Sequence, residues 1–358
     1  MSKRCGAWIC LFCLSLVSGG AQQNRLKQFE PAASVQVGGA DHRITLDVVV
    51  TDKAGKAVPG LEQRDFTLLD NKHPQQILSF HAVDGGAAAA EPPVDVILVL
   101  DELNPPFAGV AVERTAVEKY LRRNSGQLPV PVSLAFLTDT GTVRRGPSRD
   151  GNALATVLNN EGAGQTRTRE SPGSLENVRL VSIQALGRLI AGEIGRPGRK
   201  LMVWVSPGWP ISSGVLVSEY QADLFDTAVA LSDGLRTARV TLYHVNAWGV
   251  GEDRLRMIEY TPYLEGAKKP GQVEMGNLGL QVLAHQSGGL TLNANNDAEG
   301  QIAACIAEAS SFYTLAFDGL AGKAPIEYHS LELKLDKPGL TTRTRTGYYA
   351  RPEPARAH

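Results

Sequence analysis

The sequence predicts an α/β protein with a doubly wound, mostly parallel sheet and an additional antiparallel β-domain built from the N- and C-terminal segments. Two observations carry this prediction. Between residues 94 and 310, apolar strand-like runs alternate with helical stretches, which is the pattern of a parallel sheet with crossover helices. On either side, residues 41–84 and 311–351 contain short alternating strands separated by turn residues, which is the pattern of antiparallel sheets with one solvated face.

The start of the chain indicates export. Lys3 and Arg4 precede an apolar run at residues 7–17, and the small residues Gly19 and Ala21 follow it. This pattern is typical of a secretory signal peptide, here residues 1–21, that is cut after Ala21. The run is shorter than the roughly 20 residues that a membrane-spanning helix needs. We therefore expect a secreted or periplasmic protein with no integral membrane segment after signal cleavage, and residues 22–40 are expected to be a linker.

Cysteine and charge content narrow the possible functions. Three of the four cysteines lie in the signal peptide, so the mature chain keeps Cys305 alone and forms no internal disulfide. Cys305 lies in an apolar-faced helical stretch and is expected to be a buried core thiol.

The formal net charge is −1, and it becomes −3 when the two basic residues of the signal are removed. Because no basic stripe is present, we do not expect nucleic acid as a partner.

The N-terminal β segment is expected to contain three strands, at residues 44–51, 66–70 and 76–83. Gly55, Pro59, Gly60 and Asn71 supply turn signals between them. Residues 85–93, "GGAAAAEPP", are expected to be a second linker.

The α/β block follows. Its strands are expected at residues 94–101, 130–139, 142–146, 199–207, 239–249 and 288–294. Its helices are expected at residues 110–124, 151–159, 175–194, 220–238, 278–286 and 298–310. Gly126, Gly195 and Gly288 stand where helices should stop.

The tail returns to strands, at residues 311–319, 328–338 and 341–350. Three antiparallel strands are too few to form a core of their own, and the N-terminal segment has the same shortage. One β-domain shared by the two ends is therefore the economical prediction. Two separate small sheets, each packed on the α/β domain, are the alternative.

Several stretches of the chain resemble the von Willebrand factor type A domain: "VDVILVLDELN", "VPVSLAFL", "LMVWVSPGW" and "VTLYHVN". Over residues 42–351 the chain further resembles the secreted type-A-related proteins of Acidobacteria. That narrower resemblance rests on "VVVTDKAGKAVPGLEQRDFTLLDNKHPQQILSF", "LAHQSGGLTL", "SFYTLAF" and "KPGLTTRTRTGYYA". It implies a doubly wound sheet with flanking β-structure and does not imply a defined biochemical role.

The resemblance also raises the question of a divalent cation. Type A domains often bind one at the carboxyl ends of the strands, with the signature D-x-S-x-S, a loop threonine and a second aspartate. Here Asp101 holds the first position, but Leu103 and Pro105 replace both serines and Ser206 stands for the second acid. The best remaining candidate ligands for Mg²⁺ or Ca²⁺ are Asp101, Asn104, Thr166 and Ser206. This set is too poor in anionic oxygens, so we expect no functional metal site and no cofactor.

Asp101 is instead expected to accept N–H bonds from the loop that follows it. Asp139 is expected to shape the hairpin between the second and third strands of the α/β block. His244 is expected to be a satisfied core histidine, and His285 is expected to complement the C-terminal end of its helix.

No motif for hydrolytic or nucleotide chemistry is present. Ser206 and His244 could meet at the top of the sheet, which keeps a hydrolase as the alternative from another class of function. The favoured interpretation is an exported, non-enzymatic, adhesion-type module that binds a protein of unknown identity. An envelope assembly component that makes contacts through its β-domain is the runner-up.

The expected contact face is the carboxyl end of the sheet. Its candidate residues are Asp101, Glu102, Asn104, Phe107, Gln165, Thr166, Arg167, Thr168, Ser206 and Trp209. Trp209 lies in the loop "SPGWPISSG", where a tryptophan either anchors an interface or packs onto its own domain.

Overall fold

The structure is a computed structural model that describes residues 42–84, 94–161, 172–209, 218–248, 260–293 and 296–352. The expected signal peptide and both expected linkers lie outside these residues. In the described part of the chain, no helix is long and apolar enough to cross a membrane.

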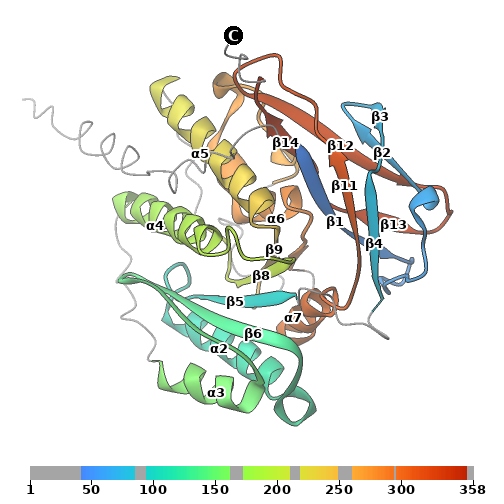
Figure 1. The fold of residues 1–358 in the computed structure, drawn as a ribbon. Helices are drawn as coiled ribbons and strands as arrows, with labels where there is room; N and C mark the ends of the chain where they lie inside the picture. The colour runs from blue at the N-terminus through green and yellow to red at the C-terminus, as the bar shows by residue number, and fades with distance from the viewer. Residues whose placement is uncertain are drawn as a thin grey trace, which may run out of the picture.

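A six-stranded sheet forms the centre of the α/β domain (Figure 1). Its strands are β5 (Asp95–Asp101), β6 (Gln127–Thr138), β7 (Gly141–Asp150), β8 (Lys200–Val205), β9 (Val240–Val245) and β10 (Thr291–Leu292). They lie in the order β10-β9-β8-β5-β6-β7, and β7 alone among them runs antiparallel to its neighbour. Numbered along the chain from β7, this order is 3-2-1-4-5-6, so the winding reverses beside β5. Such a switch point is where open α/β sheets place their ligands.

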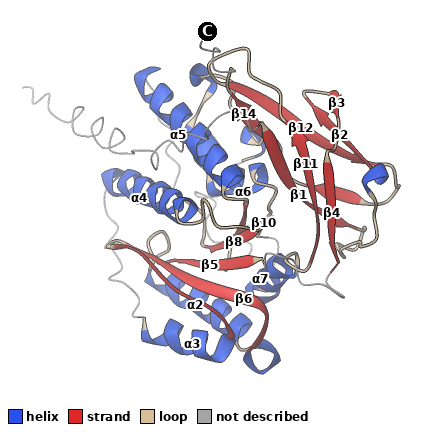
Figure 2. Cartoon of the chain, viewed as in Figure 1, coloured by secondary structure: helices blue, strands red, loops and turns tan. Residues whose placement is uncertain are grey.

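Helices cover both faces of this sheet (Figure 2). They are α2 (Phe107–Leu121), α3 (Gly151–Asn160), α4 (Pro172–Ala191), α5 (Ser218–Thr237), α6 (Leu280–Gln286) and α7 (Ala298–Ala307). The α4, α5 and α6 helices pack on the face that carries Ile97 and Val99. The α2, α3 and α7 helices pack on the face that carries Val96, Leu98 and Leu100. Because side chains alternate along β5, Asp101 belongs to the α4 face.

Two four-stranded antiparallel sheets form a β-sandwich beside the α/β domain (Figure 1). One sheet has the order β13-β1-β11-β4, from β13 (Thr341–Arg343), β1 (Arg43–Thr51), β11 (Ser311–Asp318) and β4 (Ser79–Asp84). The other has the order β14-β12-β2-β3, from β14 (Gly347–Ala350), β12 (Glu327–Leu335), β2 (Phe66–Asp70) and β3 (His73–Gln75). Short 3-10 helices complete the description: Gln63–Asp65, Arg123–Gly126, Thr261–Tyr263, Pro270–Gln272 and Met275–Leu278.

Each sheet of the sandwich mixes strands from the two ends of the chain. Ile44 in β1 lies opposite Phe317 in β11, and Leu68 in β2 lies opposite Leu333 in β12. Apolar side chains from β1, β2, β11, β12 and β14 fill a single core between the sheets. The predicted fold class is therefore confirmed, including the β-domain that both ends share, and it has the doubly wound sheet with flanking β-structure that the resemblance implies.

Several element boundaries differ from the sequence-based expectation. The strand expected at residues 76–83 starts later, at Ser79, and forms β4, whereas residues 73–75 just before it form β3 in the other sheet. Residues 341–350 are likewise divided into β13 and β14. Both segments cross from one layer of the sandwich to the other, which strand alternation alone does not reveal. Helix α2 begins at Phe107, three residues earlier than expected, because the extended backbone of Pro106 starts it, and it ends before the positive φ of Asn124.

We expect the shared sandwich to unfold as one cooperative unit. Leu68→Ala removes a buried side chain of β2 from the core between the two sheets and should lower the free energy of unfolding by about 2–4 kcal/mol. Hydrogen exchange should accelerate in β11 and β12 as well as in β2. Thr67→Ala, on the other face of the same strand, is the control and should change little. Continued slow exchange in β12 of the Leu68→Ala variant would show that the two ends fold separately.

Candidate functional site

The candidate site lies at the carboxyl edge of the central sheet, beside the switch point. Asp101 is the last residue of β5, and its side chain is completely buried. Its carboxylate accepts backbone N–H bonds from Leu103 at 3.2 Å and from Asn104 at 3.0 Å. It also accepts side-chain N–H bonds from Asn104 at 2.7 Å and from Trp204 at 2.9 Å. Four donors on one carboxylate match the acceptor-only chemistry of an ionised acid.

These bonds connect three layers of the fold. Asn104 Nδ2 also donates to Ser182 Oγ at 2.9 Å, and Ser182 lies on α4. Trp204 lies on β8, the neighbour of β5. Burial raises the pKa of Asp101, whereas the bonds from Trp204 and Asn104 act in the opposite direction. Asp101 is therefore the internal acceptor that fixes the loop after β5, as expected from the sequence.

Ser206 is also buried, and its hydroxyl oxygen is hydrogen-bonded within its own loop. Its Oγ accepts the backbone N–H of Gly208 at 3.0 Å, a residue that takes φ +95°. The Nε2 atom of His244 lies 2.9 Å from the backbone carbonyl oxygen of Ser206. A carbonyl only accepts, so Nε2 carries the proton and donates it. Ser206 and His244 do meet, but through the backbone of Ser206 and not through its hydroxyl.

Trp209 packs onto its own domain. Its side chain is 1% exposed, and its ring makes an edge contact with Trp204 at 5.4 Å between centroids. The expectation that it anchors an interface is therefore corrected in favour of the alternative. The cause is local, because the turn at Gly208 directs the loop back over the sheet and places the indole on the α4 face.

The remaining ligand positions do not fit a divalent cation. Leu103 and Pro105 are buried and carry no side-chain oxygen. The Asp101 carboxylate is held by four N–H donors, which a cation would have to displace. Thr166 lies outside the described residues. Among the described residues, no group of three or more His, Cys, Asp or Glu side chains is placed to hold a metal.

The expected contact residues separate into three groups. Gln165, Thr166, Arg167 and Thr168 lie outside the described residues. Asp101, Glu102, Asn104, Ser206 and Trp209 are buried, so they present no surface to a partner in this structure. Glu102 is held by an ion pair with Arg114 of α2. Phe107 alone among the six described candidates is exposed, with 69% of its surface accessible.

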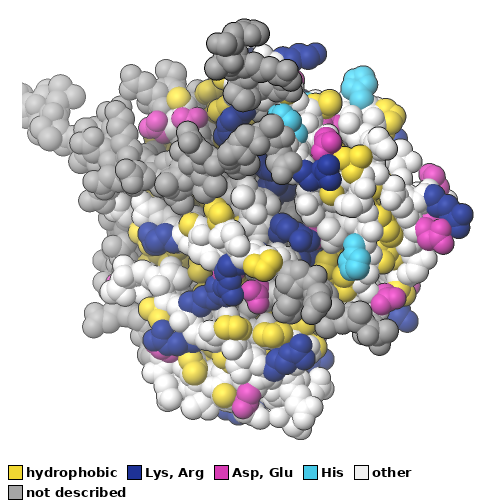
Figure 3. Space-filling view, viewed as in Figure 1, with side chains coloured by type: hydrophobic (Ala, Val, Ile, Leu, Met, Phe, Trp, Pro, Cys, Tyr) yellow, Lys and Arg dark blue, Asp and Glu magenta, His cyan; other side chains and the backbone are white. Residues whose placement is uncertain are grey.

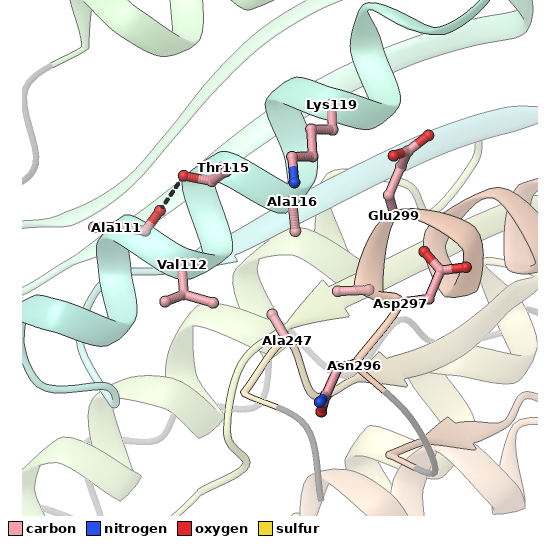
Figure 4. Close-up of a pocket in the computed structure, with 10 residues that line it drawn as sticks. Ala111, Val112, Thr115, Ala116, Lys119, Ala247, Asn296, Asp297 and Glu299 are labelled. Carbon is pink, nitrogen blue, oxygen red and sulfur yellow. Dashed lines mark hydrogen bonds between the residues drawn. The ribbon is translucent and has the colours of Figure 1, made fainter.

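Phe107 begins α2, and an apolar groove runs along that helix (Figure 4). One part of the groove has a volume of about 340 Å³ and the adjoining part about 360 Å³. Both parts share Val112, Ala247 and Asn296, so they are continuous. Val112 is 45% exposed on the rim. The groove lies at the carboxyl ends of β9 and β10, because Ala247 follows β9 and Asn296 follows β10.

Close packing against α2 depends on a glycine. A Cβ atom at Gly109 would lie 1.5 Å from the Trp248 ring, so no other residue fits there without moving the indole. Trp248 and Gly109 together form one wall of the groove. Charged groups stand at the other end: Lys119 on α2, and Asp297 and Glu299 at the start of α7. Asp297 caps α7 by accepting the Gly300 N–H at 2.8 Å.

Sequence reasoning found Phe107 and missed the rest of the groove. The available signal was the composition of α2, "FAGVAVERTAVEKY", which has small or apolar residues on more than one face. Other expectations were met: Asp139 lies exposed in the β6–β7 turn and Cys305 is buried.

His285 differs from its expectation. Its ring stacks on the Tyr260 ring, with 5.4 Å between the centroids. Burial, and next the charge of Arg343, lower the pKa of His285, which disfavours the charged form that would complement the end of α6.

Comparisons with known proteins found one kind of match, to solved structures. No family model matches the chain, and no curated protein matches it. Among solved structures, the chain is similar to the pilus adhesin SpaC from Lactobacillus rhamnosus GG, with a TM-score of 0.35 and 7% sequence identity. The match covers 84% of this chain and 50% of the adhesin, so the chain spans about half the length of that protein. A likeness of that degree does not identify a function.

We expect His244 to make the protein sensitive to acid. Burial lowers its pKa from 6.5 to about 4, and the bond to Ser206 only partly opposes this. The unfolded state therefore binds a proton more readily, and stability should fall as pH drops from about 6.5 to about 4. The loss should reach about 3 kcal/mol at the lower limit. Urea unfolding of the wild type and of His244→Gln across this range measures it.

The His244→Gln variant keeps a donor for Ser206 and should lose that part of the pH dependence. His81→Gln, at an exposed position on β4, is the control and should keep it. An unchanged slope in His244→Gln would contradict the assignment.

We expect millimolar Mg²⁺ or Ca²⁺ to raise the melting temperature by less than about 2 °C. A true site at about 100 times its dissociation constant would add about 2.7 kcal/mol to the folded state, which is several degrees. The response to metal should be the same in Asp101→Ala. A clear upward shift that Asp101→Ala abolishes would show that the oxygens around Asp101 do bind a cation.

Proposed function

We propose that this chain is an exported, non-enzymatic protein-binding module of the von Willebrand factor type A kind, within the secreted type-A-related proteins of Acidobacteria. The mature chain would begin at Gln22 and act in the periplasm or outside the cell. Its contact would be adhesion-like and independent of metal. The observation that carries the proposal is the groove along α2, with Phe107 and Val112 exposed beside it.

The chemistry of the carboxyl edge supports this choice of surface. The positions that would ligate a cation are used internally, since Asp101 is bonded to Asn104 and Trp204. The proposal therefore does not involve a cation that bridges to a partner carboxylate. The groove offers instead small apolar residues with an aromatic wall, Trp248, and Phe107 is exposed at the start of the same helix. Buried aromatic contacts of this kind often dominate protein interfaces.

The partner that fits is a protein segment that inserts one apolar side chain into the groove. Ala111, Ala116 and Ala247 leave room for it, since each presents only a methyl group. Lys119 and Glu299 at the far end supply polar contacts that could set the orientation of such a segment. Arg123 lies 3.4 Å from Glu299, so that carboxylate is already partly balanced.

The runner-up is a structural role in an envelope assembly through the β-domain. Two exposed leucines there favour it, Leu78 and Leu320, at 40% and 43% accessibility. The hydrolase alternative lacks comparable support, because the hydroxyl of Ser206 is bonded to Gly208 and not to His244.

Photo-crosslinking distinguishes these roles. A photo-reactive phenylalanine analogue in place of Phe107 should give discrete adducts with envelope or extracellular proteins, and Val112→Asp in the same chain should abolish them. The same analogue in place of Leu320 should give none. Adducts from position 320 alone would favour the β-domain role, and adducts from neither position would contradict protein binding.

A further inference from the structure

A small cavity lies at the junction of the β-sandwich and the α/β domain. Its volume is about 20 Å³, and its lining includes Arg236, Arg239 and Arg345. Basic side chains gather along this junction on the face shown in Figure 3. The wall also contains Asp47 from β1 and the hydroxyl-bearing Thr241 of β9. Three guanidinium groups therefore share one small space with a single lining carboxylate, that of Asp47.

Arg236 and Arg239 each contact a carboxylate, and Arg345 is the one of the three that contacts none among the described residues. It is 7% exposed, and its hydrogen bonds are long: Nη1 lies 3.4 Å from Ser232 O, 3.5 Å from Ser232 Oγ and 3.4 Å from Gly347 O. These distances are beyond the usual range for N–H donors. Within the described part of the chain, no carboxylate lies within ion-pair distance of its guanidinium. A buried charge without a partner is costly, so such groups normally have one.

The two nearby carboxylates are already engaged elsewhere. Asp47 binds Arg239, with oxygen–nitrogen distances of 2.5 and 3.4 Å, and accepts from Thr314 at 3.2 Å. Asp233 binds Arg351 at 2.8 Å and Arg236 at 3.6 Å. The three arginines of the cavity thus face two carboxylates, Asp47 and Asp233, which leaves an excess of one positive charge. The Nε atom of Arg236 also has no acceptor among the described residues.

The electrostatics of Arg345 agree with this excess. Burial lowers its pKa to about 10, and the charge of Arg236 lowers it further, whereas Asp233 and Asp47 act in the opposite direction. Even so, Arg345 is charged at neutral pH. The cluster therefore keeps an unbalanced positive potential inside the junction.

We propose that this cavity binds a monatomic anion, with chloride as the physiological ligand. Size selects the ligand class, because a cavity of about 20 Å³ holds one particle near the size of a water molecule. Sulfate, phosphate and organic carboxylates are larger than that space. Guanidinium N–H groups and the Thr241 hydroxyl are donors, which suit a halide that only accepts.

The anion would join the two domains. Arg236 and Arg239 belong to the end of α5 and the turn after it, Arg345 lies between β13 and β14, and Asp47 lies on β1. A bound chloride balances the sandwich side and the α/β side together. Chloride should therefore stabilise the whole protein and not one domain alone.

Thermal unfolding in two sodium salts tests the proposal. At equal ionic strength of about 150 mM, where screening of surface charges is the same, chloride is compared with gluconate, which is too large for the cavity. The melting temperature should be about 3 °C higher in chloride. Chloride-35 NMR gives direct evidence of binding, since the line should broaden when wild-type protein is added.

Variants assign the effect to the cavity. Arg345→Gln should remove both the chloride-specific shift and the line broadening, whereas Arg122→Gln, at the exposed residue that follows α2, should keep both. If Arg345→Gln fails to fold, Arg236→Gln, at a partly exposed position, should weaken chloride binding at least about 10-fold, the effect of losing one charge-assisted bond. Equal melting in the two salts without broadening would mean that the cavity holds water only. An undiminished response in the Arg345→Gln or Arg236→Gln variant would place chloride elsewhere and overturn the proposal.

Discussion

The buried carboxylate of Asp101 is the interaction on which the carboxyl edge of the sheet depends. It accepts N–H bonds from its own loop and from Trp204 on β8, and through Asn104 it is linked to Ser182 on α4. Loss of any donor would leave a buried acid partly unsatisfied, which costs more than the bond itself contributes. The same loop sets where α2 begins. The position of Phe107, and of the groove beside it, therefore follows from how Asp101 is satisfied.

The junction of the two domains is held largely by arginines. Arg199, the residue before β8, donates to the Glu308 carbonyl oxygen at 2.8 Å. Its guanidinium carbon also lies 4.6 Å from the centroid of the Phe312 ring. Arg343 of β13 forms an ion pair with the Glu308 carboxylate. Glu308 follows α7 and precedes β11, so this network fixes the point where the chain leaves the α/β domain and returns to the sandwich. Since the sandwich needs strands from both ends, that crossing point has to be rigid.

A binding surface at this edge differs in kind from a metal-dependent one. Buried protein groups fill the carboxyl edge of the sheet beside β5. The surface that remains exposed lies farther out, along α2, the segment after β9 and the start of α7. The proposed contact surface there is apolar, with the exposed Val112 and the small residues Ala111, Ala116 and Ala247 lining the groove and Phe107 exposed at the start of the same helix. Gly109 shows that the arrangement is specific, since only a residue without a Cβ lets Trp248 complete the wall. The charge clusters lie apart from this groove, at the domain junction.

The sequence by itself determined the fold class. Continuous apolar runs such as residues 94–101 indicate strands that are buried on both faces, and the alternating strands at both ends indicate sheets with one solvated face. It also indicated that Asp101 satisfies its own loop, since Leu103 and Pro105 cannot ligate. Only the tertiary structure decided that residues 73–84 and 341–350 each divide between two sheets, because crossing between layers depends on pairing with distant strands. It alone placed Trp209 inside and gathered Arg236, Arg239 and Arg345 around one cavity, since residues more than 100 positions apart in sequence meet there only through packing.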